Sequence, residues 1–203
     1  MKDQELEVKF FIADLAGLEA RLQAAGANLA QPRSHEINLR FDTPSGDLTR
    51  TSRVLRLRQD TAARLTYKGP SESQAGVRVR QELEFTVGDF DAARAFLEAL
   101  GYQVSMIYEK YRATYDLQGV HVTLDELPYG NFAEIEGPDS VSIHNVNQSL
   151  DLDWEARIAF SYTVLFDQLR STLGLAFRDL TFDNFQDLNI SPAALNVRPA
   201  DEK

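Results

Sequence analysis

Two glutamates and a lysine alternate with apolar residues at the start of the chain. Glu5, Glu7 and Lys9 take every second position, and an apolar residue follows each of them. Side chains on a β-strand point to opposite faces with a period of two residues, so the three charged groups share one face. Two carboxylates and an ammonium on one face can hold a hard divalent cation beside an anionic group. An ordinary strand with one solvated face has the same pattern, so this strand alone does not decide between them.

The same alternation returns in one predicted strand after another. The polar residues that share a face in this way are Arg56 and Arg58; Thr66 and Lys68; Arg78, Arg80, Glu82 and Glu84; Lys110 and Arg112; Thr123 and Asp125; and Glu134 and Glu136. Acidic residues crowd the first strand, the end of the fifth and the last, whereas arginine and lysine dominate the strands between them. A face that serves only solubility more often mixes the two signs. Segregated cations and carboxylates suit a polyanion and its metal ions.

Strands and helices that could position these residues follow from the apolar spacing. We predict helices over Asp14–Leu22, Asp89–Leu100, Ser140–Leu150 and Glu155–Leu173, with Asp14 as an N-cap. The polar, glycine- and serine-containing stretch Gly69–Gly76 is predicted to be a mobile loop. The predicted strands are Gln4–Phe10, Glu36–Asp42, Val54–Gln59, Arg64–Lys68, Val77–Val87, Val104–Tyr115, Val120–Asp125 and Phe132–Glu136.

Two arrangements put charge on one face of every strand. An open sheet would bury its apolar face under helices and show its charged face to water. A closed sheet would place the apolar side chains outward under helices, with the charges lining a hydrated interior. We expect residues 1–173 to form one domain and residues 174–203 to form a C-terminal arm that is partly disordered.

Composition excludes several classes of protein. The chain has 203 residues, 43% of them hydrophobic, and a net charge of −10, which disfavours binding to nucleic acids and anionic membranes. It has no cysteine, so disulfides and thiolate metal sites are excluded. No apolar run is long enough to span a membrane, and the first residues do not form a secretion leader. We therefore expect a soluble, cytoplasmic protein.

A series of motifs in the same order resembles the CYTH superfamily, also called triphosphate tunnel metalloenzymes. The resemblance begins with Glu5-x-Glu7-x-Lys9 and extends to about residue 165. The run from Leu124 and the later Ser161-Tyr162 pair are most similar to the class IV adenylyl cyclase branch. The supporting motifs are Phe41-Asp42-Thr43-Pro44, Leu55-Arg56-Leu57-Arg58, Thr66-Tyr67-Lys68-Gly69, Arg80-Gln81-Glu82, Lys110-Tyr111-Arg112, Leu124-Asp125-Glu126 and Phe132-Ala133-Glu134-Ile135-Glu136.

The resemblance implies a fold and a set of site residues. The fold would be α+β, a closed eight-stranded antiparallel β-barrel that forms a tunnel with a charged interior and is flanked by helices. The tunnel would bind a triphosphate with Mg²⁺ or Mn²⁺, and the chemical step would involve Lys9, Asp125 and Lys110. The implied metal ligands are Glu5, Glu7, Glu82, Asp125, Glu134 and Glu136, although Glu82 could instead orient an arginine and Asp125 could instead orient the substrate. The implied phosphate ligands are Lys9, Arg56, Arg58, Lys68, Arg80, Lys110 and Arg112.

Three functions remain open at this stage. The first is a class IV adenylyl cyclase that converts ATP to 3′,5′-cyclic AMP and pyrophosphate. The second is a triphosphatase that hydrolyses tripolyphosphate or a nucleoside or thiamine triphosphate. The third, a polyphosphate or nucleotide binder without turnover, is disfavoured because an anion binder gains nothing from so many carboxylates. The expected partner is a small triphosphate, and the acidic exterior leaves a homodimer open.

Overall fold

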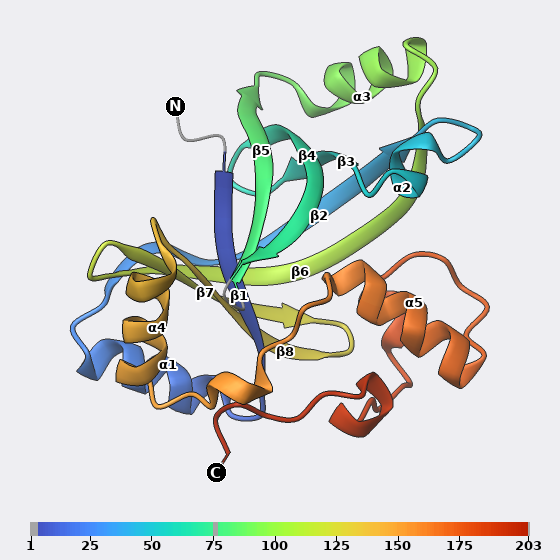
Figure 1. Cartoon of the computed structure of the whole chain (residues 1–203). Helices are drawn as coiled ribbons and strands as arrows, with labels where there is room; N and C mark the ends of the chain where they lie inside the picture. The colour runs from blue at the N-terminus through green and yellow to red at the C-terminus, as the bar shows by residue number, and fades with distance from the viewer. Residues whose placement is uncertain (1–3, 75–76, 203) are drawn as a thin grey trace.

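The computed structural model describes residues 4–74 and 77–202, without the side chains of residues 4, 5, 73, 74 and 78. Within this part of the chain, eight antiparallel strands close into a ring in the order β1-β5-β4-β3-β2-β6-β7-β8 (Figure 1). β1 completes the ring by pairing with β5 along its first half and with β8 along its second half. The strands are β1 (Gln4–Ile12), β2 (Asn28–Asp42), β3 (Val54–Gln59), β4 (Ala63–Gln74), β5 (Val77–Val87), β6 (Gln103–Leu117), β7 (Val120–Leu127) and β8 (Gly130–Glu136).

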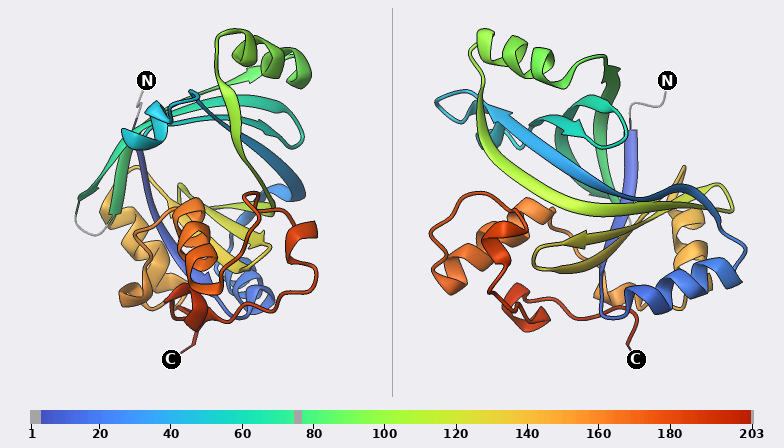
Figure 2. Two further views of the ribbon diagram at one scale, coloured as in Figure 1. Left: turned by 90° about the vertical axis from the view of Figure 1, so that its right-hand side faces the viewer. Right: turned by 180° about the vertical axis from the view of Figure 1, so that it is seen from behind.

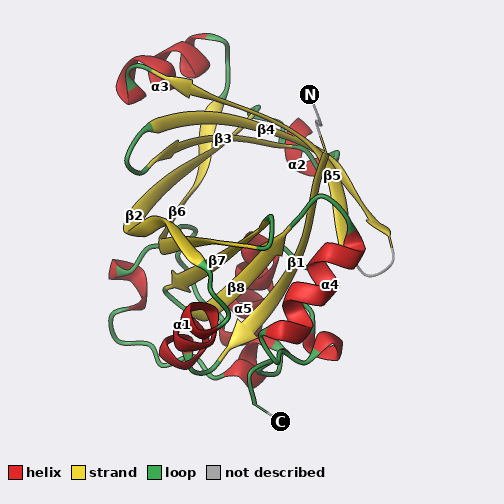
Figure 3. Cartoon of the chain, turned by 90° about the vertical axis from the view of Figure 1, so that its left-hand side faces the viewer, coloured by secondary structure: helices red, strands yellow, loops and turns green. Residues whose placement is uncertain are grey.

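The ring decides between the two arrangements that the sequence left open. The sheet is closed, and Figure 3 views it with the strands encircling the centre. β2 and β6, each 15 residues long, pair along most of their length, with register shifts near both ends of β2. The prediction of an α+β fold with an eight-stranded antiparallel sheet that closes on itself is confirmed.

Helices cover the ring on two opposite sides (Figure 2). α1, α4 and α5 lie on one side, and α3 lies on the other. Each of these four helices is preceded by an N-cap residue. The side chain of that residue accepts a hydrogen bond from a backbone N–H group in the first turn, which stabilises the helix start. The capping residues are Asp14, Asp89, Asp139 and Ser161. The helices are α1 (Leu15–Ala24), α2 (Asp47–Arg50), α3 (Phe90–Ala99), α4 (Ser140–Ser149) and α5 (Tyr162–Leu173).

The last long helix begins later than the sequence predicts. We predict a helix over Glu155–Leu173, whereas α5 starts at Tyr162 and a short 3₁₀ turn, η1 (Trp154–Ala156), precedes it. Between them, the backbone N–H of Ile158 donates to the carbonyl oxygen of Lys9 at 2.8 Å. This stretch therefore lies against β1 as an isolated bridge, because pairing with the sheet outweighs the helical pattern.

The hairpin between β4 and β5 is longer than predicted. The stretch Gly69–Gly76 is predicted to be a loop, but β4 continues to Gln74 and pairs with β5 beyond an irregularity in its middle. The loop prediction is wrong up to Gln74 because cross-strand pairing satisfies the backbone of this polar stretch. Residues 75–76 lie outside the described part of the chain.

The apolar faces of the strands pack outward against the helices. Phe10 and Ile135, from β1 and β8, are fully buried with Leu18 and Leu22 of α1 and Ile143 of α4. A second cluster lies on the cavity-facing side of the strands, where α5 covers the ring. It joins Tyr108 of β6 and Phe132 of β8 to Phe166 of α5 and to Leu180 and Phe185 of the C-terminal segment. Each such side chain contributes about 1.5–3 kcal/mol by leaving water. The first cluster fixes the outward side of β1 and β8, and the second closes the ring beside the charged residues.

The side of the ring that carries α3 is covered less completely. Phe85 lies on the apolar face of β5, opposite Arg80, Glu82 and Glu84, and this parity predicts that it packs under a helix. Its side chain is instead 59% exposed. α3 contributes Leu97 to a small cluster with Leu39 and Leu57, and Phe85 is not part of that cluster. The packing prediction for Phe85 is wrong because α3 covers the neighbouring part of the sheet.

The segment after α5 returns to the ring. Leu180 exchanges backbone hydrogen bonds with β6, through Ile107 and Glu109, both at 2.9 Å. Farther along, the N–H of Ala200 donates to the carbonyl oxygen of Phe11 at 2.9 Å. Leu195, within the 3₁₀ turn η3 (Pro192–Leu195), is buried; the other such turn is η2 (Asp183–Phe185). The predicted boundary at residue 173 stays a prediction. None of the described helices is both long and apolar enough to cross a membrane.

Candidate functional site

A cavity of about 840 Å³ lies inside the ring, and each of the eight strands contributes side chains to it. It is lined by eleven of the residues that the family resemblance implies as metal or phosphate ligands: Glu7, Lys9, Arg56, Arg58, Lys68, Arg80, Glu82, Lys110, Arg112, Glu134 and Glu136. Strand register explains this convergence, because directly opposite residues on paired strands face the same side. Glu7 lies opposite Glu136 and Lys9 lies opposite Glu134. The prediction for the Glu5 side chain falls outside the described side chains.

Glu134 is held between two cations on the side of the cavity formed by β1, β8 and β6. Lys9 Nζ lies 2.9 Å from Glu134 Oε1, and the guanidinium of Arg112 donates to Glu134 Oε2. Burial alone would raise the pKa of Glu134, but Lys9 and Arg112 hold that pKa well below its usual range. Glu134 is therefore an anion that fixes two neighbouring cations in place.

Asp125 lies behind this group and does not line the cavity. Its side chain is fully buried. Its carboxylate accepts from Arg112 Nε at 2.6 Å, from Lys110 Nζ at 3.1 Å and from the hydroxyl of Tyr162 at 2.8 Å. These contacts give Asp125 the geometry of a residue that orients Lys110 and Arg112. Its roles in metal binding and catalysis stay predictions.

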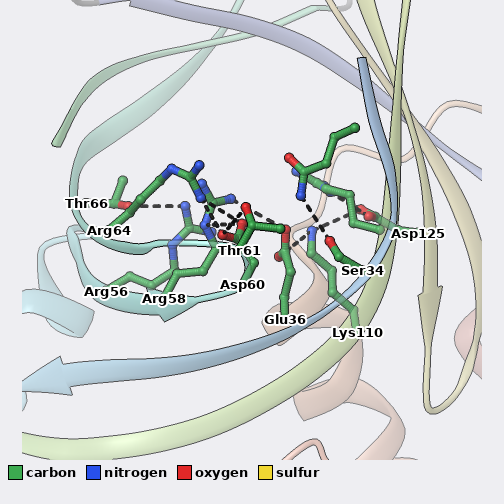
Figure 4. Close-up of polar contacts among 12 residues, drawn as sticks. Ser34, Glu36, Arg56, Arg58, Asp60, Thr61, Arg64, Thr66, Lys110 and Asp125 are labelled. Atoms are coloured by element: carbon green, nitrogen blue, oxygen red, sulfur yellow. Dashed lines mark hydrogen bonds and ion pairs between the residues drawn. The ribbon is translucent and has the colours of Figure 1, made fainter. Parts of the chain in front are cut away.

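The opposite wall, formed by β3, β4 and β5, carries arginines and one lysine interleaved with carboxylates. Figure 4 shows Arg56, Arg58 and Arg64 of this wall. Arg58 Nη2 donates to Glu84 Oε1 at 3.1 Å, and Lys68 Nζ lies 2.9 Å from Glu82 Oε2. Arg56 Nη2 lies 4.0 Å from the same Glu82 side chain. Of the two roles left open for Glu82, orienting basic residues agrees with these contacts, and metal binding stays a prediction.

Arg80 is tied to the backbone at the edge of the same wall. Its Nε donates to the carbonyl oxygen of Gly69 at 3.0 Å, and Nη2 lies 3.4 Å from the carbonyl oxygen of Ser52. The guanidinium thus joins β5 to the irregular part of β4 and to the turn before β3. The structure brings Arg80 to the cavity, and its role in binding phosphate stays a prediction.

Glu36 is a cavity residue that the sequence reading missed. Its side chain is 1% exposed and lies 3.6 Å from Arg58 on one side and 3.6 Å from Lys110 on the other. Burial would raise its pKa, but Lys110, Arg112 and Arg58 lower that pKa to about 2. Glu36 thus links the two basic walls (Figure 4). Glu36 and Arg40 lie on the same face of the predicted strand Glu36–Asp42, and both line the cavity. Applying the alternation to this strand would have identified both residues.

Tyr162 reaches the site from α5, which is not part of the ring. Its buried ring lies 4.0 Å from Lys9 Nζ, measured to the ring centroid, and its hydroxyl donates to Asp125. The hydroxyl of Tyr129 donates to the carbonyl oxygen of Tyr162 at 2.9 Å and anchors the helix start. Burial and the carboxylates of Asp125 and Glu134 raise the pKa of Tyr162 well above its usual range, so it stays a hydrogen-bond donor. Tyr162 reaches Lys9 and Asp125 because α5 packs against the ring, a contact that strand alternation does not predict.

The chemistry of the carboxylates in the cavity suits a hard divalent cation. Glu7, Glu134 and Glu136 lie side by side on β1 and β8 and offer oxygen donors, which Mg²⁺ and Mn²⁺ prefer. Among the described residues, no three acidic or histidine side chains converge closely enough to hold a metal by themselves. Mg²⁺ is usually held by one or two carboxylates together with phosphate oxygens, so this donor set fits such an ion when a phosphate shares it.

Comparisons with known proteins agree with this geometry. The CYTH domain model matches residues 3–145, whereas no curated protein sequence matches the chain. A solved structure of a candidate adenylate cyclase from Vibrio parahaemolyticus is 22% identical, with a TM-score of 0.73 over 82% of this chain and 99% of that one. A Pyrococcus horikoshii protein is 25% identical, with a TM-score of 0.65 over 78% and 96% of the two chains.

A third structure has a related fold and a described activity of its own. It is a candidate adenylyl cyclase from Hippeastrum, reported to have a dominant triphosphatase activity, which is 18% identical with a TM-score of 0.64 over 80% of this chain and 95% of that one. The family match runs from the first strand of the ring past the last one and ends before α5. The chain therefore belongs to the CYTH domain family, as the order of its strand motifs predicts.

Proposed function

We propose that this protein is a divalent-metal-dependent enzyme that acts on a triphosphate, and that its reaction is the cyclisation of ATP to 3′,5′-cyclic AMP and pyrophosphate. The observation that carries the proposal is the cavity of about 840 Å³ whose opposite walls present cations and carboxylates from seven of the eight strands. In this proposal the ring is a tunnel with a charged interior. Membership of the CYTH domain family supports it, because such proteins are typically enzymes acting on triphosphates.

The cations of both walls would bind the phosphate oxygens. Lys110 and Arg112 are held by Asp125, and Arg58 is held by Glu84 and Glu36, so these groups are positioned before a ligand arrives. Fixed cations stabilise charge that develops on phosphate oxygens without having to reorganise during the reaction.

Glu7, Glu134 and Glu136 are the residues that would hold the metal ion. The ion would supply positive charge to neutralise the phosphates and a template to orient them. Glu134 also accepts from Lys9 and Arg112, so metal, lysine and arginine would meet on one side of the substrate. In the cyclisation, the ribose 3′-hydroxyl gives up its proton to solvent as its oxygen forms the new bond to the α-phosphorus. The bond from that phosphorus to the oxygen bridging to the β-phosphorus breaks, and pyrophosphate leaves with its electrons.

A triphosphatase reaction is the alternative, with water as the nucleophile in place of the ribose hydroxyl. The phosphate and metal ligands would be the same, because phosphoryl transfer depends mainly on positioning and charge stabilisation. The structure from Hippeastrum favours keeping this alternative, since its protein is described as a candidate cyclase with dominant triphosphatase activity. A binder without turnover is the third reading, and the carboxylates on both walls argue against it.

One incubation separates these functions. The purified protein is mixed with Mg²⁺ or Mn²⁺ and either ATP or tripolyphosphate, and the products are resolved by anion-exchange chromatography. We expect cyclic AMP and pyrophosphate from ATP. ADP and phosphate, or pyrophosphate and phosphate from tripolyphosphate, would identify the triphosphatase. Binding without any product would contradict an enzymatic function with these two substrates.

A further inference from the structure

A short segment of the cavity wall differs in chemistry from the rest. Residues 159–164, which precede α5 and form its first turn, line the cavity alongside the charged strands. Phe160 is 49% exposed and Val164 is 39% exposed, and both face this space. Exposed apolar side chains at the rim of a charged cavity are suited to a ligand that carries an apolar, planar group as well as phosphates.

The backbone around Phe160 is fixed on both sides. Before it, Ile158 is hydrogen-bonded to Lys9 of β1 at 2.8 Å. After it, the carbonyl oxygen of Tyr162 accepts from the hydroxyl of Tyr129, and the hydroxyl of Thr163 accepts from Arg40 Nη1 at 2.8 Å. The aromatic ring of Phe160 is therefore presented by a positioned backbone, one of whose anchors is the phosphate-binding candidate Lys9.

The space beside Phe160 is larger than a phosphate chain requires. A cavity of about 840 Å³ is within the range of about 300–1,000 Å³ that is usual for organic ligands and cofactors. Ala159 and Phe160 also line a second cavity of about 920 Å³ between α5 and the C-terminal segment. Ala159 and Phe160 thus lie between two spaces, and an organic group attached to the phosphates would have room beside Phe160. Within the described residues, the ring of Phe160 has no aromatic partner.

We infer that Phe160 is the stacking platform for the base of a nucleoside triphosphate, with the phosphates among the basic walls. This inference rests on the proposed function and selects nucleoside triphosphates over inorganic tripolyphosphate as the substrate class. Aromatic side chains stack on nucleobases because each base has a π face, so one ring binds different bases. The hydroxyls of Ser161 and Thr163, 3.1 Å apart on the same wall, are placed for the ribose.

The first test compares two substrates in three proteins with Mg²⁺ or Mn²⁺ present. Phe160→Ala is expected to raise KM for ATP about tenfold, the usual order for losing one stacked base. The affinity for tripolyphosphate, measured as KM if it is hydrolysed and otherwise as Ki against ATP, is expected to stay unchanged, because that ligand has no base. Phe96→Ala is the matched control, since Phe96 is 63% exposed on α3 and does not line the cavity. It should change neither value.

The second test measures binding without turnover. The Phe160→Trp variant keeps an aromatic ring and adds an indole whose fluorescence a stacked base quenches. ATP is expected to quench this fluorescence and tripolyphosphate is not. The wild-type protein, which contains only Trp154, supplies the background signal.

The outcomes separate the inference from the proposed function. Equal losses for ATP and tripolyphosphate in Phe160→Ala, unchanged values for both, or no quenching by ATP would each overturn the stacking role while the proposed function stands. A wild-type protein that turns over tripolyphosphate but neither binds nor turns over ATP would also overturn it. A wild-type protein that turns over neither triphosphate would instead contradict the proposed function.

Discussion

The hydroxyl of Tyr162 donates a hydrogen bond to Oδ2 of Asp125 at 2.8 Å, across the boundary between the C-terminal helix and the ring. The same carboxylate also accepts hydrogen bonds from Lys110 and Arg112, so Tyr162 is linked to both cations through Asp125. The ring of Tyr162 also lies 4.0 Å from Lys9 Nζ, a distance at which a cation is attracted to an aromatic face. One side chain outside the CYTH domain match thus contacts two elements of the candidate site.

Removing the hydroxyl of Tyr162 should reduce the rate more than the affinity. In Tyr162→Phe the ring still lies under Lys9, but Asp125 loses one of its donors, and loss of such a supporting hydrogen bond costs about 10–100-fold in activity. We expect kcat for the triphosphate to fall by that order while KM changes little, because the phosphate-binding cations remain in the cavity. Tyr162→Leu removes the ring as well and should lower kcat further. Steady-state kinetics with Mg²⁺ measure both.

Tyr129→Phe is the control for these variants. It also deletes one buried hydroxyl, but its partner is the backbone carbonyl oxygen of Tyr162 and not Asp125. Both phenylalanine variants should lose about 1 kcal/mol of unfolding free energy, the usual worth of a buried hydrogen bond. If Tyr129→Phe lowers kcat as much as Tyr162→Phe does, the effect comes from the fit of α5 and the positioning role of Tyr162 is wrong.

Replacing Glu136 with Gln should abolish turnover and leave the fold intact. The substitution keeps the size of the side chain and removes a negative oxygen that is proposed to bind the metal. Activity is measured over a range of Mg²⁺ and Mn²⁺ concentrations, and folding is checked by thermal unfolding. Glu98→Gln, on the exposed surface of α3, is the control and should keep full activity. Full activity of Glu136→Gln at low metal concentration would exclude Glu136 as a ligand.

Strand parity predicted which side chains meet inside the ring. The alternation from Glu7 to Glu136 names most of the cavity-facing residues, because side-chain direction in a strand is a local property. Closure of the sheet came from the family resemblance and not from the alternation, which suits an open sheet equally well. Glu36 was missed although it obeys the same rule, since the reading did not extend the parity argument to β2.

Other features of the site depend on tertiary structure. Asp125 has the parity of a lining residue, yet it is fully buried because Lys110, Arg112 and Tyr162 cover its carboxylate. No spacing rule indicates that Tyr162, 37 positions away, would reach it. The start of α5 was misplaced for a similar reason, since a backbone hydrogen bond to Lys9 replaced helix formation around Ile158.

Changing Arg58 to Ala should weaken binding of a triphosphate far more than binding of AMP. A charge-assisted contact of arginine to phosphate contributes about 1.5–3 kcal/mol, so we expect a rise in Kd of about 10–100-fold for the triphosphate. AMP carries only the phosphate next to the ribose and should lose less. Isothermal titration calorimetry measures both ligands, with Arg94→Ala on α3 as the control. Equal losses for the two ligands would place Arg58 away from the outer phosphates.

The ionisation of Glu36 makes the free energy of unfolding depend on pH in the acidic range. Its folded-state pKa of about 2 is below the usual value of 4.5, because Lys110, Arg112 and Arg58 stabilise the anion more than burial destabilises it. A carboxyl with a lowered folded pKa stabilises the protein fully above its unfolded pKa and loses that contribution as pH falls through the folded pKa. The window therefore runs from about 4.5 down to about 2, with an upper bound of about 3 kcal/mol at neutral pH.

Glu36→Gln should therefore destabilise the protein at pH 7 and should do so less as the pH falls below 4.5. Lys110 and Arg58 lose a shared counter-charge in the variant, and breaking a buried ion pair is costly. Urea unfolding of wild type and variant at pH 7, 5.5, 4.5 and 3.5 measures the difference in unfolding free energy. A difference that stays constant across these pH values would show that Glu36 acts through packing and not through its charge. Glu98→Gln should give no difference at any of them, because its side chain is exposed.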